Sequence, residues 1–229
     1  MQKGIWVIGD VHGEYEKLLL LLSKLPKDAI VCFTGDLIDR GEESAKVVEL
    51  VINNGYFCVL GNHEVMMIES DKSKHNAEYW FNNGGVETLS SYARCDEEVF
   101  TKHVRYFKTL PYFAYFEIEG HKPLVVSHSY MHHIWVSKEH PYSKDDVEDI
   151  LWRHMKKSEY FDAQKEAQNG IFNIFGHTPV YGAVITNTYA MIDTGAVYED
   201  NKHFGILSAI CYPTLEVRST GVEKKLIYV

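Results

Sequence analysis

The stretch GIWVIGDVHG, residues 4–13, sets the pattern from which the rest of the chain is interpreted. Its first part, Gly4–Gly9, is a short apolar run rich in β-branched and aromatic residues, which predicts a buried strand. Asp10 and His12 follow directly after it. The same order returns twice, because Ala29–Thr34 predicts a strand followed by GDLIDRG, and Tyr56–Leu60 predicts a strand followed by GNHE.

Helices are predicted between these strands, over Glu14–Leu25 and Glu42–Asn53. Consecutive leucines at Leu18–Leu22 indicate that the first helix is buried on a broad face. Strands that alternate with helices through short connections imply parallel pairing and right-handed crossovers. The first part of the chain therefore predicts an α/β layered fold.

Beyond Asn62 the pattern is helical and amphipathic to about Lys108, with a break at Asn82–Gly85. A second helical stretch covers Asp145–Glu166. Strand signals dominate the rest, at Tyr112–Ile118, Pro123–Ser127, Ile171–Phe175, Tyr189–Ile192, Phe204–Ile210 and Thr214–Val217. There is no internal repeat and no Pro- or Ser-rich linker, so we expect one domain over residues 1–229.

The composition bounds the possible functions. Of 229 residues, 45% are hydrophobic, which supplies a core and excludes intrinsic disorder. The net charge of −9 disfavours a nucleic-acid partner. No apolar run reaches the ~18 residues of a membrane-spanning helix. The beginning of the chain does not resemble a signal peptide, and the scattered cysteines include no CxxC, so a cytoplasmic protein is expected. The oligomeric state is left open.

Polar side chains gather at the ends of the predicted strands. Parallel strands of an open α/β sheet bring their carboxyl ends to one edge, where ligands bind. Two later strands end in the same way, at His128 and at GHTP, which contains His177. The candidate ligands are Asp10, His12, Asp36, Asn62, His128 and His177. Carboxylate, amide and imidazole donors suit divalent metals of hard to intermediate character rather than thiolate-bound zinc.

This donor set exceeds what one catalytic metal takes, and a pair of ions about 3.5–4 Å apart fits it better. Two divalent ions would bring four positive charges, of which Asp10 and Asp36 cancel two. With Arg40 beside them, the centre would carry net positive charge in an acidic protein. Such a local inversion selects a compact anion such as phosphate.

In this order, GDVHG, GDLIDRG, GNHE, a lone histidine after a strand and GHTP resemble the calcineurin-like metallophosphoesterases, and within them the bacterial and phage serine/threonine phosphoprotein phosphatases. The resemblance runs from about Ile5 to Gly195 and implies an αββα fold, a central β-sandwich flanked by helices. It further implies two divalent ions, manganese foremost, with iron or zinc as alternatives. The implied ligands are Asp10, His12 and Asp36 for the first ion, and Asp36, Asn62, His128 and His177 for the second.

The resemblance also implies a mechanism. A hydroxide that bridges the metals would attack phosphorus in line, with no phosphoenzyme intermediate. His63, held by Asp39, would act as general acid, and Arg40 and Asn62 would contact the substrate. The pairing of a carboxylate with a histidine independently favours that role for His63, because it fixes the tautomer and raises the basicity of the ring.

Some positions leave alternatives open. Small bacterial members often carry a second phosphate-binding arginine as Trp-x-Arg, whereas here Arg153 directly follows Trp152 and is either a phosphate ligand or a surface ion-pair partner. Asp193 either supports the site or shapes a turn, and Glu64 is expected to begin a helix rather than bind metal. Histidines outside the site are expected to be solvated or locally hydrogen-bonded, namely His75, His103, His121, His132, His133, His140, His154 and His203.

The predicted function is hydrolysis of phosphomonoesters, with phosphoserine or phosphothreonine in a phosphoprotein as the main substrate and small phosphoesters as further ones. Hydrolysis of symmetrical dinucleoside polyphosphates is the first alternative, and a non-catalytic scaffold is the second. The segments 70–108 and 130–143 are expected to form the rims that select the substrate.

Overall fold

The computed structural model describes residues 4–159, 170–198, 203–222 and 225–227. Its strands are β1 Ile5–Ile8, β2 Ile30–Phe33, β3 Phe57–Cys58, β4 Phe113–Phe116, β5 Leu124–Ser127, β6 Phe172–Phe175, β7 Ala183–Ile185, β8 Tyr189–Met191, β9 Ser208–Tyr212, β10 Glu216–Ser219 and β11 Lys225–Ile227. Its α-helices are α1 Tyr15–Ser23, α2 Ser44–Asn53, α3 Asn62–Glu69, α4 Lys74–Trp80, α5 Val86–Tyr92, α6 Glu97–Phe107 and α7 Lys144–Trp152. A π-helical turn, Phe81–Gly85, joins α4 to α5, and short 3-10 turns span His132–Ile134 and Lys157–Glu159.

The strands form two sheets. The first has the order β10-β9-β1-β2-β3, and the second has the order β11-β7-β8-β6-β5-β4. As predicted, β1, β2 and β3 are parallel, with Trp6 opposite Val31 and Cys32 opposite Phe57. In the second sheet β5, β6 and β8 are parallel neighbours. Both sets of parallel strands can therefore deliver the residues after them to one edge of the sandwich.

The hydrophobic core lies between the sheets and continues on their outer faces. Because strand side chains alternate between faces, Val7 points into the sandwich while Trp6 packs against the helices. In the second sheet Val126 points into the sandwich, whereas Val125 packs with Ile150 of α7. Strands β1 and β5 are thus covered on both faces, which explains why their sequences are unbroken apolar runs.

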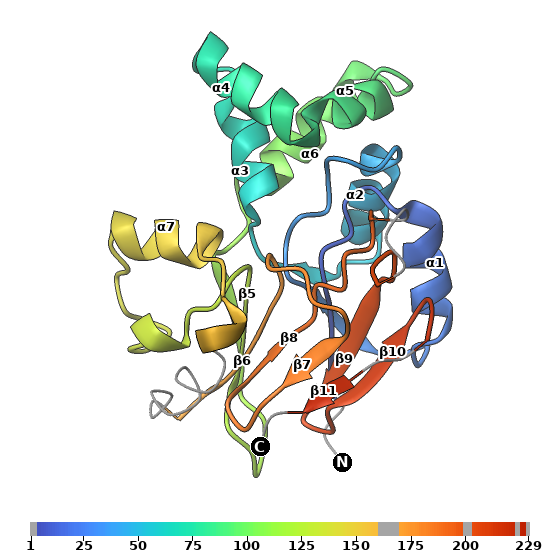
Figure 1. The fold of residues 1–229 in the computed structure, drawn as a ribbon. Coiled ribbons are helices and arrows are strands. Elements are labelled where there is room, and N and C mark those ends of the chain that lie inside the picture. Colours follow the sequence, from blue (N-terminus) through green and yellow to red (C-terminus); the bar gives the residue numbers. More distant parts are fainter. Residues whose placement is uncertain (1–3, 160–169, 199–202, 223–224, 228–229) are drawn as a thin grey trace.

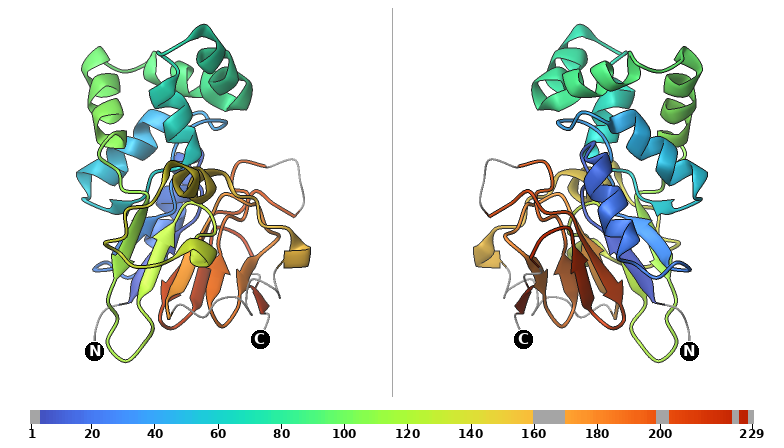
Figure 2. Two further views of the ribbon diagram at one scale, coloured as in Figure 1. Left: turned by 90° about the vertical axis from the view of Figure 1, so that its left-hand side faces the viewer. Right: turned by 90° about the vertical axis from the view of Figure 1, so that its right-hand side faces the viewer.

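The helices complete the layers. Helices α1 and α2, drawn in blue, cover the first sheet, and α7, drawn in yellow, lies on the opposite side of the molecule (Figure 1). Figure 2 shows that the group α3–α6 projects beyond one end of the sheets. The predicted α/β fold with a central β-sandwich flanked by helices is confirmed. None of the described helices has the length and apolar character needed to cross a membrane.

One helix is shorter than predicted, and another is less buried. The stretch predicted as a helix over Asp145–Glu166 ends in α7 at Trp152, and residues 160–169 lie outside the described part of the chain. The helix ends there because Met155 is drawn into a buried cluster on the second sheet and its N–H donates to Thr178. The leucine run is also less buried than predicted, since Leu19 and Leu20 are exposed on α1.

Strand boundaries near the carboxyl end differ from the prediction as well. The predicted strand Phe204–Ile210 is displaced to Ser208–Tyr212, because antiparallel pairing with β1 places Tyr212 opposite Ile5. Strands β7 and β11 had not been predicted. Long-range pairing, which leaves little local signal in the sequence, decides these edges.

Candidate metal centre

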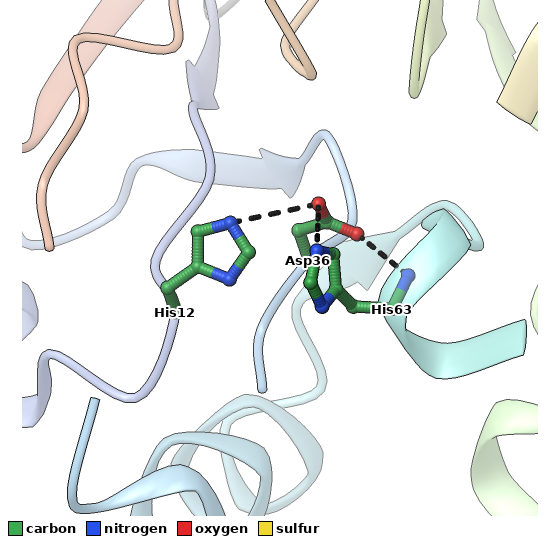
Figure 3. A group of neighbouring side chains, drawn as sticks. All are labelled: His12, Asp36 and His63. Atoms are coloured by element: carbon green, nitrogen blue, oxygen red, sulfur yellow. Dashed lines mark hydrogen bonds and ion pairs between the residues drawn. The ribbon is translucent and has the colours of Figure 1, made fainter. Parts of the chain in front are cut away.

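Asp36 lies at the middle of the predicted site, directly after β2. Its Oδ2 is 3.6 Å from Nε2 of His12 and 3.9 Å from Nε2 of His63, and both rings approach this oxygen (Figure 3). The two rings also lie edge to face, with their centroids 4.7 Å apart. Its Oδ1 accepts the backbone N–H of His63 at 3.1 Å and is 3.4 Å from Nε2 of His128. One carboxylate therefore faces two groups of nitrogen donors.

The second group joins residues that are more than a hundred positions apart. Nε2 of His128 lies 2.7 Å from Oδ1 of Asn62 and 3.1 Å from Nδ1 of His177. Among the described residues, two sets of donor atoms lie within 4.8 Å of one another: His12, Asp36 and His63, and Asp36, His128 and His177. All are buried, and Asp36 belongs to both sets, as an ion-bridging carboxylate would.

The hydrogen bonds of these histidines show which atoms are free to bind a cation. Nδ1 of His12 contacts the carbonyl of Ile38 at 2.8 Å, and Nδ1 of His128 contacts the carbonyl of Thr34 at 2.8 Å. A carbonyl only accepts, so each Nδ1 carries the proton and each neutral ring directs a lone pair from Nε2 toward the centre. Histidines that bind metals have this backbone anchor. Nε2 of His128 and Oδ1 of Asn62 are then two hydrogen-bond acceptors only 2.7 Å apart, and their lone pairs repel each other. A cation bound by both atoms would remove this repulsion.

The pKa values of the site follow from its burial. Loss of water lowers the pKa of His128 to about 4 and that of His177 to about 2, so both rings are neutral at pH 7. Burial also raises the pKa of Asp10 and of Asp36 well above the usual range, and Asp193 and Glu64 respectively add to the effect. Buried carboxylates beside lone pairs are electrostatically unfavourable without added positive charge, and divalent cations fit this donor set.

Asp10 is placed beside the centre but is held by other groups. Its Oδ1 accepts from the hydroxyl of Thr34 at 2.9 Å, and its Oδ2 accepts the backbone N–H of His177 at 2.9 Å. It belongs to neither donor set among the described residues. The contact requires glycine at residue 176, because a Cβ there would collide with Asp10. Asp10 thus joins the end of β1 to the end of β6 and lies next to Asp36.

His63 and Asp39 form the predicted pair. Nδ1 of His63 donates to Oδ2 of Asp39 at 2.7 Å, which leaves Nε2 directed toward Asp36. Asp39 is buried and also accepts from Nε1 of Trp80 at 2.9 Å and from the hydroxyl of Thr88 at 2.7 Å. Burial raises the pKa of Asp39 to about 8, and the hydrogen bonds from Thr88 and Trp80 oppose that rise. Both donors belong to residues 70–108, which contain α4–α6 and are called the helical insert below, and the sequence had not marked either residue as a support of the site.

Arg40 reaches the centre from the same loop. Its NH1 lies 2.7 Å from Nε2 of His12 and donates to the lone pair of that ring. A positive charge thus already lies at one of the two donor groups. The insert fixes this loop too, because the N–H of Arg40 donates to the carbonyl of Gly84 at 3.0 Å. Gly84 has a φ of +104°, and a Cβ there would lie 2.7 Å from Cγ of Arg40, so only glycine fits.

The structure does not bring Arg153 to the centre. Its guanidinium lies 3.4 Å from Glu159 and 3.8 Å from Asp149, and it is over the ring of Tyr130. The next residue, His154, lies there instead: its ring centroid is 4.3 Å from that of His177, and it remains exposed. The chain is extended after α7, so neighbouring side chains point in opposite directions.

His154 is thus the histidine whose surroundings differ most from the sequence prediction. A usable signal was present, because the third position of Trp-x-Arg, counted from Trp152, is residue 154 rather than 153. Tyr130 is buried rather than on a rim, and the ring of His133 stacks on it. His132 is buried as well, whereas His103 is hydrogen-bonded to Tyr92 as expected.

Glu64 and Asp193 shape the backbone around the site. Glu64 accepts the N–H groups of Gly61, Asp36 and Leu37 at 2.8–3.0 Å, so it ties the start of α3 to the loop after β2. It begins a helix, as predicted, and it also positions Asp36. Asp193 accepts the N–H of Gly195 at 2.8 Å, which is the turn that was one of its two predicted roles, and its carboxylate also raises the pKa of Asp10.

Backbone strain is concentrated at the same residues. Among the described residues other than glycine, a positive φ occurs at His12, Asp36, Asp39, Arg40, His177 and Leu215, with values from 47° to 73°. All but the last are predicted site residues. Such conformations cost about 1–3 kcal/mol each and persist where the surrounding structure enforces them, which is common at active sites.

Comparison with known proteins points to one family. A family model described as calcineurin-like phosphoesterase matches residues 4–205. The chain is 28% identical over 209 residues to serine/threonine-protein phosphatase 2 of Salmonella typhimurium, which covers 89% of this chain and 93% of the relative. It is 26% identical over 239 aligned positions to bis(5'-nucleosyl)-tetraphosphatase PrpE of Anoxybacillus flavithermus, described as asymmetrical, which covers 93% and 92%.

Solved structures agree on the fold. A serine/threonine phosphatase of Saccharomyces cerevisiae superposes with a TM-score of 0.63 at 16% identity, covering 97% of this chain and 81% of that one. A metallophosphoesterase of Sphaerobacter thermophilus gives a TM-score of 0.59 at 19% identity, covering 96% and 88%. The shared architecture extends over nearly the whole chain.

Proposed function

The chain belongs to the calcineurin-like phosphoesterases, and we propose that within this family it is a dinuclear-metal phosphomonoesterase acting on phosphoserine and phosphothreonine in proteins. Family membership makes it a hydrolase of phosphoesters. The observation that carries the finer proposal is the shared carboxylate of Asp36 between two donor groups, with the His63–Asp39 pair facing it. Relatives named serine/threonine-protein phosphatases support the substrate class.

In this proposal Asp36 is common to both metal positions. Asp10 and His12 complete the first, while Asn62, His128 and His177 complete the second. Two divalent ions, manganese foremost, would supply Lewis acidity and lower the pKa of a bound water. The carbonyls of Ile38 and Thr34 hold the rings of His12 and His128 in the ligating tautomer.

The remaining residues act on the substrate. Nδ1 of His63 donates to Asp39, so Nε2 can give a proton to the departing alkoxide only when the ring is in its imidazolium form, whose positive charge the carboxylate of Asp39 would stabilise. The guanidinium of Arg40 contacts His12 of one donor group, and the exposed imidazole of His154 lies against His177 of the other. Both side chains can donate hydrogen bonds to phosphoryl oxygens. In this proposal His154, rather than Arg153, is the second phosphate-binding side chain.

Hydrolysis of p-nitrophenyl phosphate with manganese present tests this mechanism. We expect His63→Asn to lower kcat by about 10²-fold or more, since general acid–base catalysis contributes that much. Asp10→Asn removes a charged metal ligand and should also lower kcat strongly, because the Lewis acidity of the metal is then reduced. Metal content, measured by mass spectrometry, should stay intact in His63→Asn. Unchanged turnover in both variants would contradict the proposal.

A second candidate substrate is a dinucleoside tetraphosphate, since a relative named an asymmetrical tetraphosphatase aligns with 93% of this chain. A relative named as symmetrical aligns with only 32% of it. Side-by-side turnover of a phosphothreonine peptide and diadenosine tetraphosphate decides between the candidates. Water attack at an end phosphate would give ATP and AMP, and attack at the middle would give two molecules of ADP, so chromatography of the products also assigns the cleavage position.

A further inference from the structure

A pocket of about 610 Å³ lies between helices α3 and α4 on one side and α7 on the other, and none of the proposed metal ligands lines it. Its walls include Met66 and Glu69 of α3, Tyr79 of α4, and Glu148 and Trp152 of α7. The rings of Tyr79 and Trp152 are 6.3 Å apart and join the two sides. In Figure 1, α7 lies on the same side of the molecule as α3 and α4. None of these side chains takes part in the mechanism above.

Both walls of the pocket belong to segments of the chain that also carry residues of the metal centre. Helix α3 begins with Asn62 and His63, and Glu69 is its last residue, about 10 Å further along the axis at 1.5 Å per residue. On the other wall Trp152 ends α7 two positions before His154, which contacts His177. A substrate held at the centre can therefore extend into this pocket.

The charges and aromatic rings of the lining residues indicate which ligands the pocket can bind. A second hollow on α7 shares Glu148 and Trp152 with it. Across the two hollows the acidic lining residues are Glu69, Asp145, Asp146, Glu148 and Asp149, against the single cation Arg153. That cation is already paired with Asp149 and Glu159. Glu69 pairs with Lys72, but both side chains are exposed, so an incoming cation can compete for that carboxylate.

A basic side chain matches this lining. Arginine and lysine lay their apolar stems against aromatic rings and keep the charged head near carboxylates. Arginine also gains from stacking on an indole or phenol face. We propose that the pocket binds an arginine or lysine of a phosphorylated peptide, which makes it a specificity site for basic sequences. This inference rests on the proposed protein phosphatase function and names the peptide class it prefers.

The geometry also gives the position of that residue in the substrate. An extended peptide rises about 3.3 Å per residue, so the ~10 Å along α3 corresponds to about three residues. The basic side chain should stand two to four positions from the phosphoserine or phosphothreonine. A polyphosphate chain fits this place poorly, because carboxylates at Glu69 and Glu148 would repel it.

The experiment uses the full chain with manganese and one alanine-rich phosphothreonine peptide. Arginine or glutamate replaces alanine at each position from four before to four after the phosphothreonine. We expect arginine at one position to raise kcat/KM about fivefold over alanine at low ionic strength, and glutamate to lower it. The preference should shrink in 0.5 M salt, as attraction at an exposed site does.

Charge-neutral variants connect the preference to the pocket. In the double variant Glu69→Gln/Glu148→Gln the arginine preference should fall below about twofold, while turnover of p-nitrophenyl phosphate stays at the level of the unmodified chain. The matched control is Glu78→Gln, an exposed glutamate of α4 that pairs with Lys74 and does not line the pocket. It should retain the full preference.

Different outcomes overturn different claims. Equal kcat/KM for all peptides, or a preference that survives in Glu69→Gln/Glu148→Gln, refutes the pocket while leaving the phosphatase proposal intact. Faster turnover of diadenosine tetraphosphate than of any arginine peptide, lost in Trp152→Leu, means that a nucleobase occupies the pocket and refutes the inference. No turnover of p-nitrophenyl phosphate or of the alanine peptide refutes the proposed function itself.

Discussion

Thr88→Val removes one hydroxyl from the network that holds the proposed general acid. Thr88 is fully buried on α5, and its Oγ1 donates to Oδ1 of Asp39 at 2.7 Å. The same oxygen accepts the backbone N–H of Asp39 at 2.9 Å, but Ser44 also accepts that N–H, at 3.2 Å. Valine has nearly the shape of threonine, so the change deletes the bond to the carboxylate, together with a 3.0 Å hydrogen bond to the hydroxyl of Ser44, without opening a cavity.

The size of the effect follows from the hydrogen bonds that remain. Asp39 keeps His63 and Trp80 as side-chain donors, so it loses one of three. A hydrogen bond to a charged group contributes about 1.5–3 kcal/mol, and we expect the free energy of unfolding to fall by about 2 kcal/mol. If about 1.4 kcal/mol of this is needed to hold His63 during proton transfer, kcat falls about tenfold. The pKa of Asp39 should also rise, because Thr88 lowers it, so the loss in kcat should be larger at pH 6 than at pH 9.

The assay is steady-state hydrolysis of p-nitrophenyl phosphate against pH, with urea unfolding of the same preparations. Thr186→Val is the matched control, because Thr186 is buried and hydrogen-bonded to the backbone of Tyr189 in the turn between β7 and β8. It should cost similar stability and leave kcat within about twofold. Thr88→Ser keeps the hydroxyl and should restore most of the activity. If Thr88→Val lost stability but kept kcat, the insert would not support the acid.

Three further results are expected. His154→Ala should raise KM for p-nitrophenyl phosphate and the inhibition constant of inorganic phosphate about three- to tenfold, whereas Arg153→Ala should change neither constant. If Arg153→Ala raised both constants and His154→Ala neither, Arg153 would be the phosphate ligand. Gly84→Ala should lower kcat/KM and the melting temperature by displacing Arg40. Gly120→Ala, which also has a positive φ but open space around it, should lower only the melting temperature. Equal kcat/KM in the two variants would refute the role of Gly84 in placing Arg40. Metal-stripped protein should lose about 1 kcal/mol of stability from pH 7.5 to 9 in urea titrations, because the pKa of Asp39 is about 8 when folded, above its unfolded value, so the stabilising proton is lost as pH rises. Histidines are neutral in both states over this range, and a stability that rises with pH would contradict the raised pKa of Asp39.

The metal donors could be predicted from the sequence because their positions depend on a simple rule of folding. Parallel strands of one sheet end at one edge, so correct strand assignments were enough to expect Asp36 after β2 beside the residues that follow β1 and β3. His177 follows β6 in the second sheet, and its place beside Asp36 also depends on how the two sheets pack. The structure brings Asp36 and His177 within reach of His128. Errors in strand ends of one or two residues did not matter at four of the six ligands, since a glycine directly before each of them marks the turn independently of the strand boundary; these ligands are Asp10, Asp36, Asn62 and His177.

The supports of the general acid could not be predicted in the same way. Trp80 and Thr88 contact Asp39 across 41 and 49 residues, and neither carries a local signal beyond a helical pattern. Their partner depends on how the insert packs on the loop after β2, which periodicity does not describe. The exchange of Arg153 for His154 has a different cause, because it depends on whether α7 continues past Trp152, and a tertiary contact of Met155 decides that.

These two kinds of support divide the site into two parts with separate structural origins. The sandwich holds the metal donors, since Asp10 bridges β1 and β6, and Glu64 ties Asp36 to α3. The insert holds Asp39 and Arg40, whose backbones are strained at φ values of 73° and 69° and lie against Thr88 and Gly84. Changes in the insert should therefore alter proton delivery and phosphate binding while metal affinity is preserved. An insert with this task is a part of the catalytic machinery as well as a rim for the substrate.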